Sequence, residues 1–143
     1  MAQQTIAVGS DHAGFKLKTR IKSLLNELGF LVLDLGTQDE ISVDYPDYAK
    51  KVAKNIISKK SDLGILICGS GTGMAMSANK FKKIRAAVCY NKASTRLSRQ
   101  HNNANIMALG ARLTKKTDAI KLVNVFLNTK FEGGRHLRRV KKV

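Results

Sequence analysis

A short glycine-rich segment follows an apolar run near the middle of the chain, and a cysteine stands at the junction. Cys68 ends the apolar run, and Gly69, Gly71 and Gly73 come directly after it. Three alternating glycines let backbone N–H groups approach a ligand closely, because no Cβ stands in the way. A helix beginning after them would favour the thiolate of Cys68. The pattern predicts a base or nucleophile beside amide donors; the alternative is a tight turn next to a small buried thiol.

The glycine-rich segment matches neither of two common nucleotide-binding patterns. It lacks the Gly-Lys-Ser/Thr end of a phosphate-binding P-loop and the GxGxxG spacing of dinucleotide-binding folds. Asp34 stands roughly where a ribose-binding acid would stand in a dinucleotide site. The loop after the first apolar run has no central glycine, however, so NAD binding is a weak alternative.

Two of the three histidines lie at the ends of an expected strand or helix, where catalytic groups often collect. His12 lies next to Asp11 after the first apolar run, and His101 closes a helical segment. A carboxylate beside an imidazole can orient the ring or accept a proton from a hydroxyl group. A satisfied structural histidine is the alternative. No local ligand spacing supports metal binding by Cys68, His12 and His101, so we expect no metal site.

Arginines near the end of the chain have a spacing suited to phosphate. Arg135 and Arg139 are four residues apart, so on a helix both guanidinium groups would point the same way. Two such groups can bind a phosphate through paired hydrogen bonds. Arg112 follows the fifth apolar run and could add a third positive group. The alternative is a basic tail that only aids solubility or attracts nucleic acid.

The chain carries 26 Lys and Arg against 10 Asp and Glu, which gives a formal net charge of +16. Such a charge attracts phosphorylated small molecules or nucleic acid. The basic residues are spread along the chain, and only the segment 130–143 is densely positive, so a solvated lysine-rich surface is the simpler interpretation. The few aromatic residues do not cluster, which argues against base stacking and hence against a specific nucleic-acid partner.

Short apolar runs alternate with helical patterns along the whole chain. We expect strands over 5–9, 31–35, 64–68, 85–89 and 105–109. Most of these runs are apolar throughout, as in parallel strands covered on both faces. The sequence therefore predicts one α/β domain over residues 1–143, a three-layer α/β/α architecture around a five-stranded parallel sheet of flavodoxin/Rossmann-like type. A flavodoxin-like strand order is the first expectation.

Helical stripes separate the expected strands. Leucines and an isoleucine between residues 17 and 28 mark a helix that Gly29 can end, and a second helix begins around Pro46. A third apolar stripe runs from Ala119 to Leu127. Ligands of open parallel sheets bind beyond the carboxyl ends of the strands. We therefore expect the segments 9–14, 68–73 and 98–103 to face one crevice.

No stretch of the sequence approaches the roughly 18 apolar residues of a membrane span, and the first residues lack the features of an export signal. The two cysteines, Cys68 and Cys89, are too few for a disulfide scaffold. We expect a cytoplasmic protein with reduced thiols and no membrane partner.

Several separated motifs, in this order, resemble those of one enzyme family. They are GSDHAGFKLK, DLGT, DYPDYA, GILICGSGTGMAMSANK, IRAAVC, LSRQHNNANIMALGAR and FEGGRHLRRV. The sequence resembles the family of ribose-5-phosphate isomerase B, which also contains allose-6-phosphate isomerase and the subunits of galactose-6-phosphate isomerase. The resemblance runs from about Ile6 to Val140.

The resemblance implies interconversion of an aldose phosphate and its ketose through an enediolate, without metal or cofactor. The first expected substrate pair is ribose 5-phosphate and ribulose 5-phosphate, in the pentose phosphate pathway, and the alternative is a six-carbon sugar phosphate. Carried over by position, Cys68 is the base, and His101 with Asp11 opens the sugar ring. The loop residues that would surround the developing oxyanion are Gly69, Ser70, Gly71, Thr72 and Gly73.

The same resemblance assigns the substrate-binding residues. His12, Arg112, Arg135 and Arg139 would hold the phosphate, and Tyr45 and Asn102 would line the sugar pocket. The resemblance also implies pockets between subunits, and hence a homodimer or tetramer. Members that use a glutamate base carry it just after the glycines, where this chain has Met74.

Overall fold

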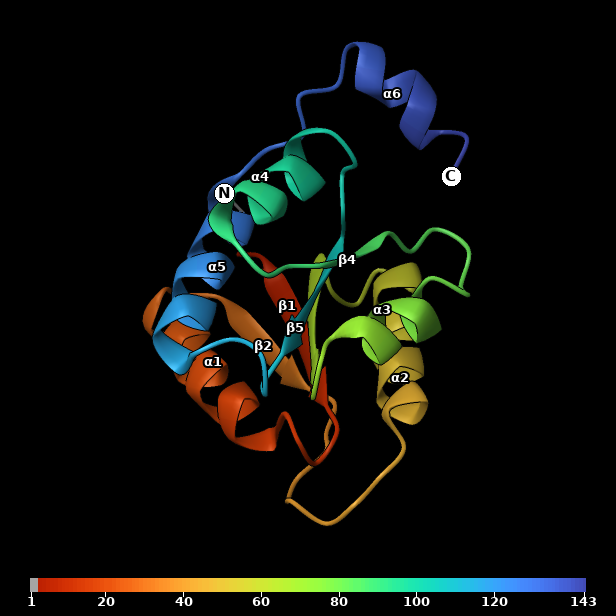
Figure 1. Cartoon of the computed structure of the whole chain (residues 1–143). Helices are drawn as coiled ribbons and strands as arrows, with labels where there is room; N and C mark the ends of the chain where they lie inside the picture. The colour runs from red at the N-terminus through yellow and green to blue at the C-terminus, as the bar shows by residue number, and fades with distance from the viewer. Residues whose placement is uncertain (1–2) are drawn as a thin grey trace.

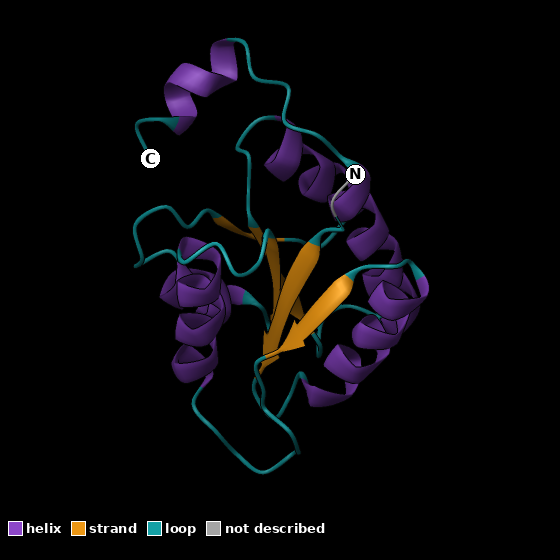
Figure 2. Ribbon diagram, turned by 180° about the vertical axis from the view of Figure 1, so that it is seen from behind, coloured by secondary structure: helices purple, strands orange, loops and turns teal. Residues whose placement is uncertain are grey.

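One parallel sheet lies between two layers of helices in the computed structural model, which describes residues 3–143 (Figures 1 and 2). The strands are β1 (Thr5–Ser10), β2 (Leu31–Asp34), β3 (Leu63–Cys68), β4 (Ala86–Val88) and β5 (Ile106–Gly110). The helices are α1 (Phe15–Glu27), α2 (Tyr45–Ile57), α3 (Thr72–Ala78), α4 (Lys92–Gln100), α5 (Lys116–Asn128) and α6 (Arg135–Val140). The α/β class and all five expected strands are confirmed.

Alternate residues of the strands face the two helix layers. On β1, Ile6 and Val8 pack into one apolar cluster, whereas Ala7 packs into the other. The central strands β3 and β5 are buried along their whole length. This burial explains why those strands are apolar at every position rather than at every second one.

The expected flavodoxin-like order was wrong for the last two strands. The observed order is β2-β1-β3-β5-β4, whereas a flavodoxin-like sheet would place β4 between β3 and β5. The physical reason is burial: β5 has five fully covered residues, and β4 has three that are only partly covered. The more apolar strand takes the inner position, and the short strand takes the edge.

The reversed order of β4 and β5 determines which face of the sheet α4 covers. Crossovers between parallel strands are right-handed, so a connection that reverses direction along the sheet crosses on the opposite face. The connections through α2 and α3 run one way, and those through α1 and α4 run the other way. Accordingly α4 packs with α5, on the face that α1 covers, while α2 packs with α3 on the other face (Figure 1).

The helix boundaries follow the expected local signals. Gly29 adopts a φ of +87° just after α1, as predicted for a helix end. Pro46 occupies the first turn of α2, where its missing N–H is not needed. Within residues 3–143, no helix has both the length and the apolar character needed to cross a membrane.

Candidate active site

The thiol of Cys68 lies beneath the glycine-rich loop. Cys68 is the last residue of β3, and the N–H of Gly71 donates a hydrogen bond to its Sγ at 3.2 Å. Its side chain is buried, with 4% exposed, whereas Ser70 and Thr72 on the same loop are exposed. The structure therefore brings a sulfur and an oriented amide together at the carboxyl edge of the sheet.

The backbone of the loop packs directly on the end of β5. A Cβ on Gly71 would lie 3.0 Å from the carbonyl carbon of Leu109, and one on Gly110 would lie 2.7 Å from the carbonyl of Ser70. Gly71 also has a φ of +81°, which side chains disfavour. Gly71 and Gly110 thus allow the backbone of the loop to pack tightly against the backbone at the end of β5.

We expect Gly71→Ala to destabilise the protein by more than Gly29→Ala. Both glycines have a φ above +80°, a conformation that costs about 1–2 kcal/mol for an alanine. Only at Gly71 would the new methyl group meet backbone atoms, since nothing lies within 4 Å at Gly29. Urea unfolding of both variants measures the difference, and equal losses would contradict a tightly seated loop.

Arg112 and Tyr45 border the loop on two sides. The N–H of Arg112 donates to the carbonyl of Gly69 at 3.0 Å, and a Cβ on Gly69 would lie 3.0 Å from the guanidinium group. The ring of Tyr45 covers Gly73 so closely that a Cβ there would lie 2.5 Å from it. The structure thus brings these two predicted substrate-binding residues to the loop beside Cys68.

His12 is held by the segment that leads into α2. Its Nδ1 accepts a hydrogen bond from the N–H of Val43 at 3.2 Å. When Nδ1 accepts, the proton of the neutral ring resides on Nε2. His12 can therefore present an N–H donor to an anionic oxygen at the carboxyl edge of the sheet.

Asp11 joins the β1 loop to the strand that carries Cys68. Its N–H donates to the carbonyl of Ile67 at 3.2 Å, and its Oδ1 accepts from the N–H of Gly14 at 3.1 Å. Asp11 is almost fully buried. The hydrogen bond from Gly14 thus uses Oδ1 to stabilise the turn before α1, and Oδ2 takes part in neither of these bonds.

A buried lysine stabilises the loop after β2, and the sequence analysis did not identify this lysine. Nζ of Lys18 donates to Asp34 Oδ1 at 2.5 Å and to the carbonyl of Thr37 at 2.7 Å, and its side chain is 1% exposed. Lys22 binds the other carboxylate oxygen of Asp34 at 2.7 Å. Lysines thus bind both carboxylate oxygens of Asp34, which does not favour a role for Asp34 as the ribose-binding acid of an NAD site. The only sequence signal was the KLK triplet of the first motif.

This network fixes the loop that pairs with the end of β1. Gly36 and Thr37 exchange backbone hydrogen bonds with Ser10 at 2.7 and 2.8 Å. Burial alone would raise the pKa of Asp34, but hydrogen bonds from Lys18, Lys22 and the N–H of Gly36 hold that pKa below its usual value. Burial lowers the pKa of Lys18 despite its attraction to Asp34.

His101, Asn102, Arg135 and Arg139 do not lie with the other predicted site residues, and the expectation of one crevice within the chain was wrong. Helices of this fold run antiparallel to the strands, so α4 begins at the carboxyl edge and ends at the amino edge, where His101 follows it. In Figure 1, α6 lies at the opposite end of the molecule from the loop between β2 and α2.

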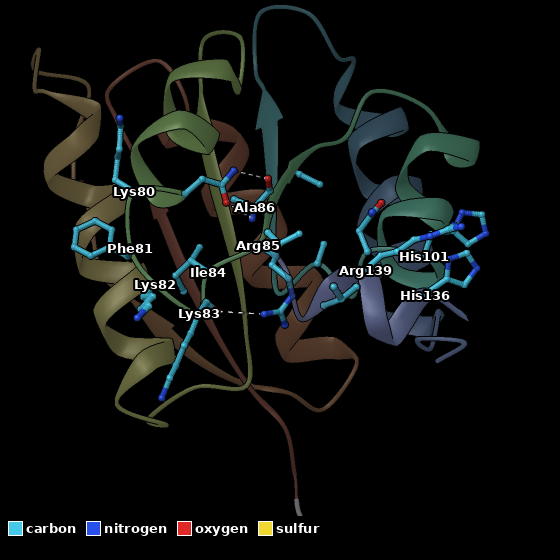
Figure 3. Close-up of a pocket in the computed structure, with 16 residues that line it drawn as sticks. Lys80, Phe81, Lys82, Lys83, Ile84, Arg85, Ala86, His101, His136 and Arg139 are labelled. Carbon is cyan, nitrogen blue, oxygen red and sulfur yellow. Dashed lines mark hydrogen bonds between the residues drawn. The ribbon is translucent and has the colours of Figure 1, made fainter. Parts of the chain in front are cut away.

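The amino-edge residues border a large basic cavity. It has a volume of about 850 Å³ and is lined by His101, Asn102, His136 and Arg139, together with the segment 79–87 (Figure 3). Arg135 and Arg139 are exposed on α6, four residues apart as predicted. This cavity does not include Cys68. The two halves of the predicted site therefore lie at opposite ends of one chain.

The second cysteine has the environment of a structural thiol. Cys89 is 1% exposed, and this burial raises its pKa despite hydrogen bonds with Thr95 and Ser98. An apolar setting of this kind disfavours the reactive thiolate.

Sequence and structure comparisons agree on one class of enzyme. The profile of the Ribose/Galactose Isomerase family matches residues 6–143. A putative sugar phosphate isomerase of Rickettsia bellii is 45% identical over 100% of this chain and 99% of its own length. Ribose-5-phosphate isomerase B of Escherichia coli is 46% identical over 96% of this chain and 93% of its own length.

Solved structures of relatives superpose closely on this chain. A ribose 5-phosphate isomerase of Thermotoga maritima has a TM-score of 0.96 and 50% identity, covering 99% of this chain and 97% of its own. Ribose-5-phosphate isomerase B of Mycoplasma genitalium, solved with bound ribulose-5-phosphate, has a TM-score of 0.92 and 44% identity, covering 96% and 92%. The fold and the site define a sugar-phosphate isomerase. The chain belongs to the ribose/galactose isomerase family.

Proposed function

We propose that this protein interconverts ribose 5-phosphate and ribulose 5-phosphate through an enediolate, a reaction of the pentose phosphate pathway, with Cys68 as the base. The observation that carries the proposal is the hydrogen bond from the N–H of Gly71 to the sulfur of Cys68. With this bond, the sulfur, as proton acceptor, lies beside backbone amide groups that can stabilise an enediolate. The named activity of the Escherichia coli and Thermotoga maritima relatives supports this substrate pair.

The chemistry requires a base and oxyanion donors on one small element. The thiolate removes the C2 proton of the open-chain aldose, and the electron pair moves toward O1 to give the enediolate. Amide groups of the glycine loop stabilise the negative charge on oxygen, and one such donor is typically worth about 10²–10³ in rate. The sulfur then delivers the proton to C1, while the hydroxyl proton of O2 passes to O1, and the ketose forms.

A second copy of the chain completes the proposed site. Cys68, His12 and Arg112 occupy the carboxyl edge of the sheet, while His101 and the two arginines of α6 occupy the amino edge. In the proposed homodimer, the amino edge of one subunit faces the carboxyl edge of its partner. His101 then lies close to Asp11 across the subunit boundary and opens the furanose ring with it before proton transfer, while Asn102 lines the sugar pocket.

Coupled assays with purified protein test the proposed reaction. We expect ribose 5-phosphate to be isomerised with a higher kcat/KM than allose 6-phosphate or galactose 6-phosphate. A preference for either six-carbon substrate would assign the chain to another branch of the same family. Absence of turnover on all three would overturn the proposed function.

We expect Arg135→Ala and Arg139→Ala mainly to raise KM, with a smaller loss of kcat. A phosphate remote from the reacting carbons is bound about equally in the ground and transition states, and loss of such binding raises KM. The matched control is Arg138→Ala, because Arg138 is exposed on the same helix but does not line the amino-edge cavity, whereas Arg139 does. Steady-state kinetics measure all three, and an equal effect at Arg138 would indicate a general charge effect.

A further inference from the structure

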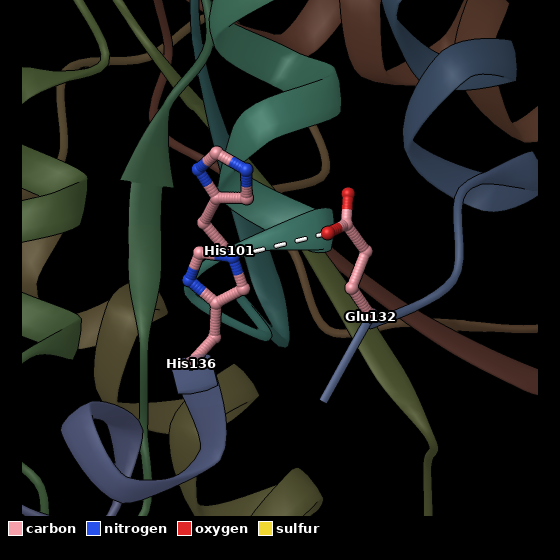
Figure 4. A group of neighbouring side chains, drawn as sticks. All are labelled: His101, Glu132 and His136. Carbon is pink, nitrogen blue, oxygen red and sulfur yellow. Dashed lines mark ion pairs between the residues drawn. The ribbon is translucent and has the colours of Figure 1, made fainter. Parts of the chain in front are cut away.

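Three metal-ligating side chains converge at the amino edge, beside the cavity (Figure 4). One ligand atom from each of His101, Glu132 and His136 lies within 4.8 Å of the others. Glu132 Oε2 is 3.8 Å from His136 Nε2, and the two imidazole rings stack with centroids 4.2 Å apart. Two imidazoles and one carboxylate are a common donor set for Zn²⁺ when a fourth position stays open.

A second observation points independently to a ligand. His136 is 7% exposed, and its Nε2 is a buried nitrogen without a hydrogen-bond partner within residues 3–143. That nitrogen faces Glu132 at a distance too long for a hydrogen bond. An unpaired buried polar atom costs free energy, so an ion between these two groups would satisfy it.

Charged groups of both signs lie close to His136. Arg135 and Arg139 oppose a cation by charge, whereas Glu132, which is exposed, supplies a negative charge.

Binding requires one ring to turn. The planes of His101 and His136 are 13° apart, and the lone pairs of stacked rings cannot meet at one ion. His101 is only partly buried, and the described contact of its ring is the stacking with His136. Rotation of this ring would bring its nitrogen toward the other two ligands, which must approach to about 2.0–2.2 Å from zinc.

We propose that His101, Glu132 and His136 form a binding site for a divalent transition-metal ion of the Zn²⁺ type, and that the bound ion inhibits the enzyme by engaging His101. Imidazole ligands favour Zn²⁺ over Mg²⁺, which prefers oxygen ligands and keeps its waters. The inhibitory half rests on the proposed role of His101 in ring opening. The binding half does not depend on that role.

Competition with a chromophoric chelator tests zinc binding directly on the full-length protein. We expect one Zn²⁺ per chain, and at least a tenfold weaker affinity in Glu132→Gln, because even outer-shell partners of a metal typically contribute about 10–100-fold. Glu27→Gln is the matched control, since Glu27 is an exposed glutamate on α1. Cys68→Ala should keep the affinity, which separates this site from thiol binding. Equal affinity in Glu132→Gln and Glu27→Gln would overturn the site.

Inhibition is measured on the same variants with ribose 5-phosphate. Zn²⁺ should inhibit the wild type and the Glu27→Gln protein, the inhibition constant of Glu132→Gln should rise by the same factor as its dissociation constant, and Mg²⁺ should have no effect. Binding without inhibition would overturn the inhibitory half. Zinc binding that depends on Glu132 in a protein without isomerase activity would overturn the proposed function and support the metal site.

Discussion

Replacing Cys68 by alanine is expected to lower kcat for ribose 5-phosphate by about 10²–10⁴-fold, the usual contribution of a positioned base. The sulfur lies under the glycine loop, and the residue that directly follows those glycines is the fully buried Met74, which is not a base. A stopped coupled assay measures the loss. KM should change much less, because the base acts on the transition state.

The control for this substitution is Cys89→Ala. Cys89 is equally buried but belongs to the apolar cluster on the other face of the sheet from Cys68. This variant should lose some stability and keep its kcat. A Cys68→Ala protein that retains most of its activity would contradict the assignment of the base.

Asp34→Asn is expected to lower the free energy of unfolding by about 3–5 kcal/mol, because removing one partner of a buried ion pair leaves the other charge uncompensated. The charge left behind is that of Lys18, whose side chain is 1% exposed and only 2.5 Å from the carboxylate. Urea denaturation at neutral pH measures the change. Activity should fall as well, since the network holds the loop that pairs with Ser10.

Two further variants isolate the cause of that destabilisation. Lys18→Met in the Asp34→Asn background removes the unpaired charge and should restore part of the stability. Glu40→Gln breaks an exposed ion pair with Lys16 and should cost at most about 1 kcal/mol. An Asp34→Asn protein no less stable than Glu40→Gln would contradict a buried ion pair.

The stability contributed by Asp34 also depends on pH. Its pKa lies below the usual 3.8 in the folded protein. The folded state therefore binds fewer protons than the unfolded state in the interval between the two pKa values. This contribution is fully present above the unfolded pKa and is lost as the pH falls through the folded pKa. The wild type should lose stability over that range, whereas Asp34→Asn should lose less.

The strands and the glycine loop could be predicted from the sequence because both depend on local patterns. Fully apolar runs such as Ile65–Cys68 identify strands covered on both faces. The strand order could not be predicted, because it depends on a comparison of burial between β4 and β5. Periodicity within either strand carries no information about its neighbours in the sheet.

The positions of the candidate site residues likewise could be predicted only where they depend on local patterns. Residues at or just after the carboxyl ends of strands, such as Cys68 and Arg112, meet at the carboxyl edge as expected. His101 follows a helix, and the helices run antiparallel to the strands, so it lies at the other edge. The cluster of His101, Glu132 and His136 joins the end of α4 to α6, a contact that no local spacing indicates.

Mixing two inactive variants tests most directly whether Cys68 and His101 act together across a subunit boundary. Cys68→Ala and His101→Asn are each expected to be nearly inactive, and a dimer containing one chain of each has one site with both residues intact. After unfolding, mixing in equal amounts and refolding, we predict recovery of about a quarter of the wild-type activity, as two-fold symmetry requires. No recovery from a mixture that forms mixed dimers would contradict the shared site.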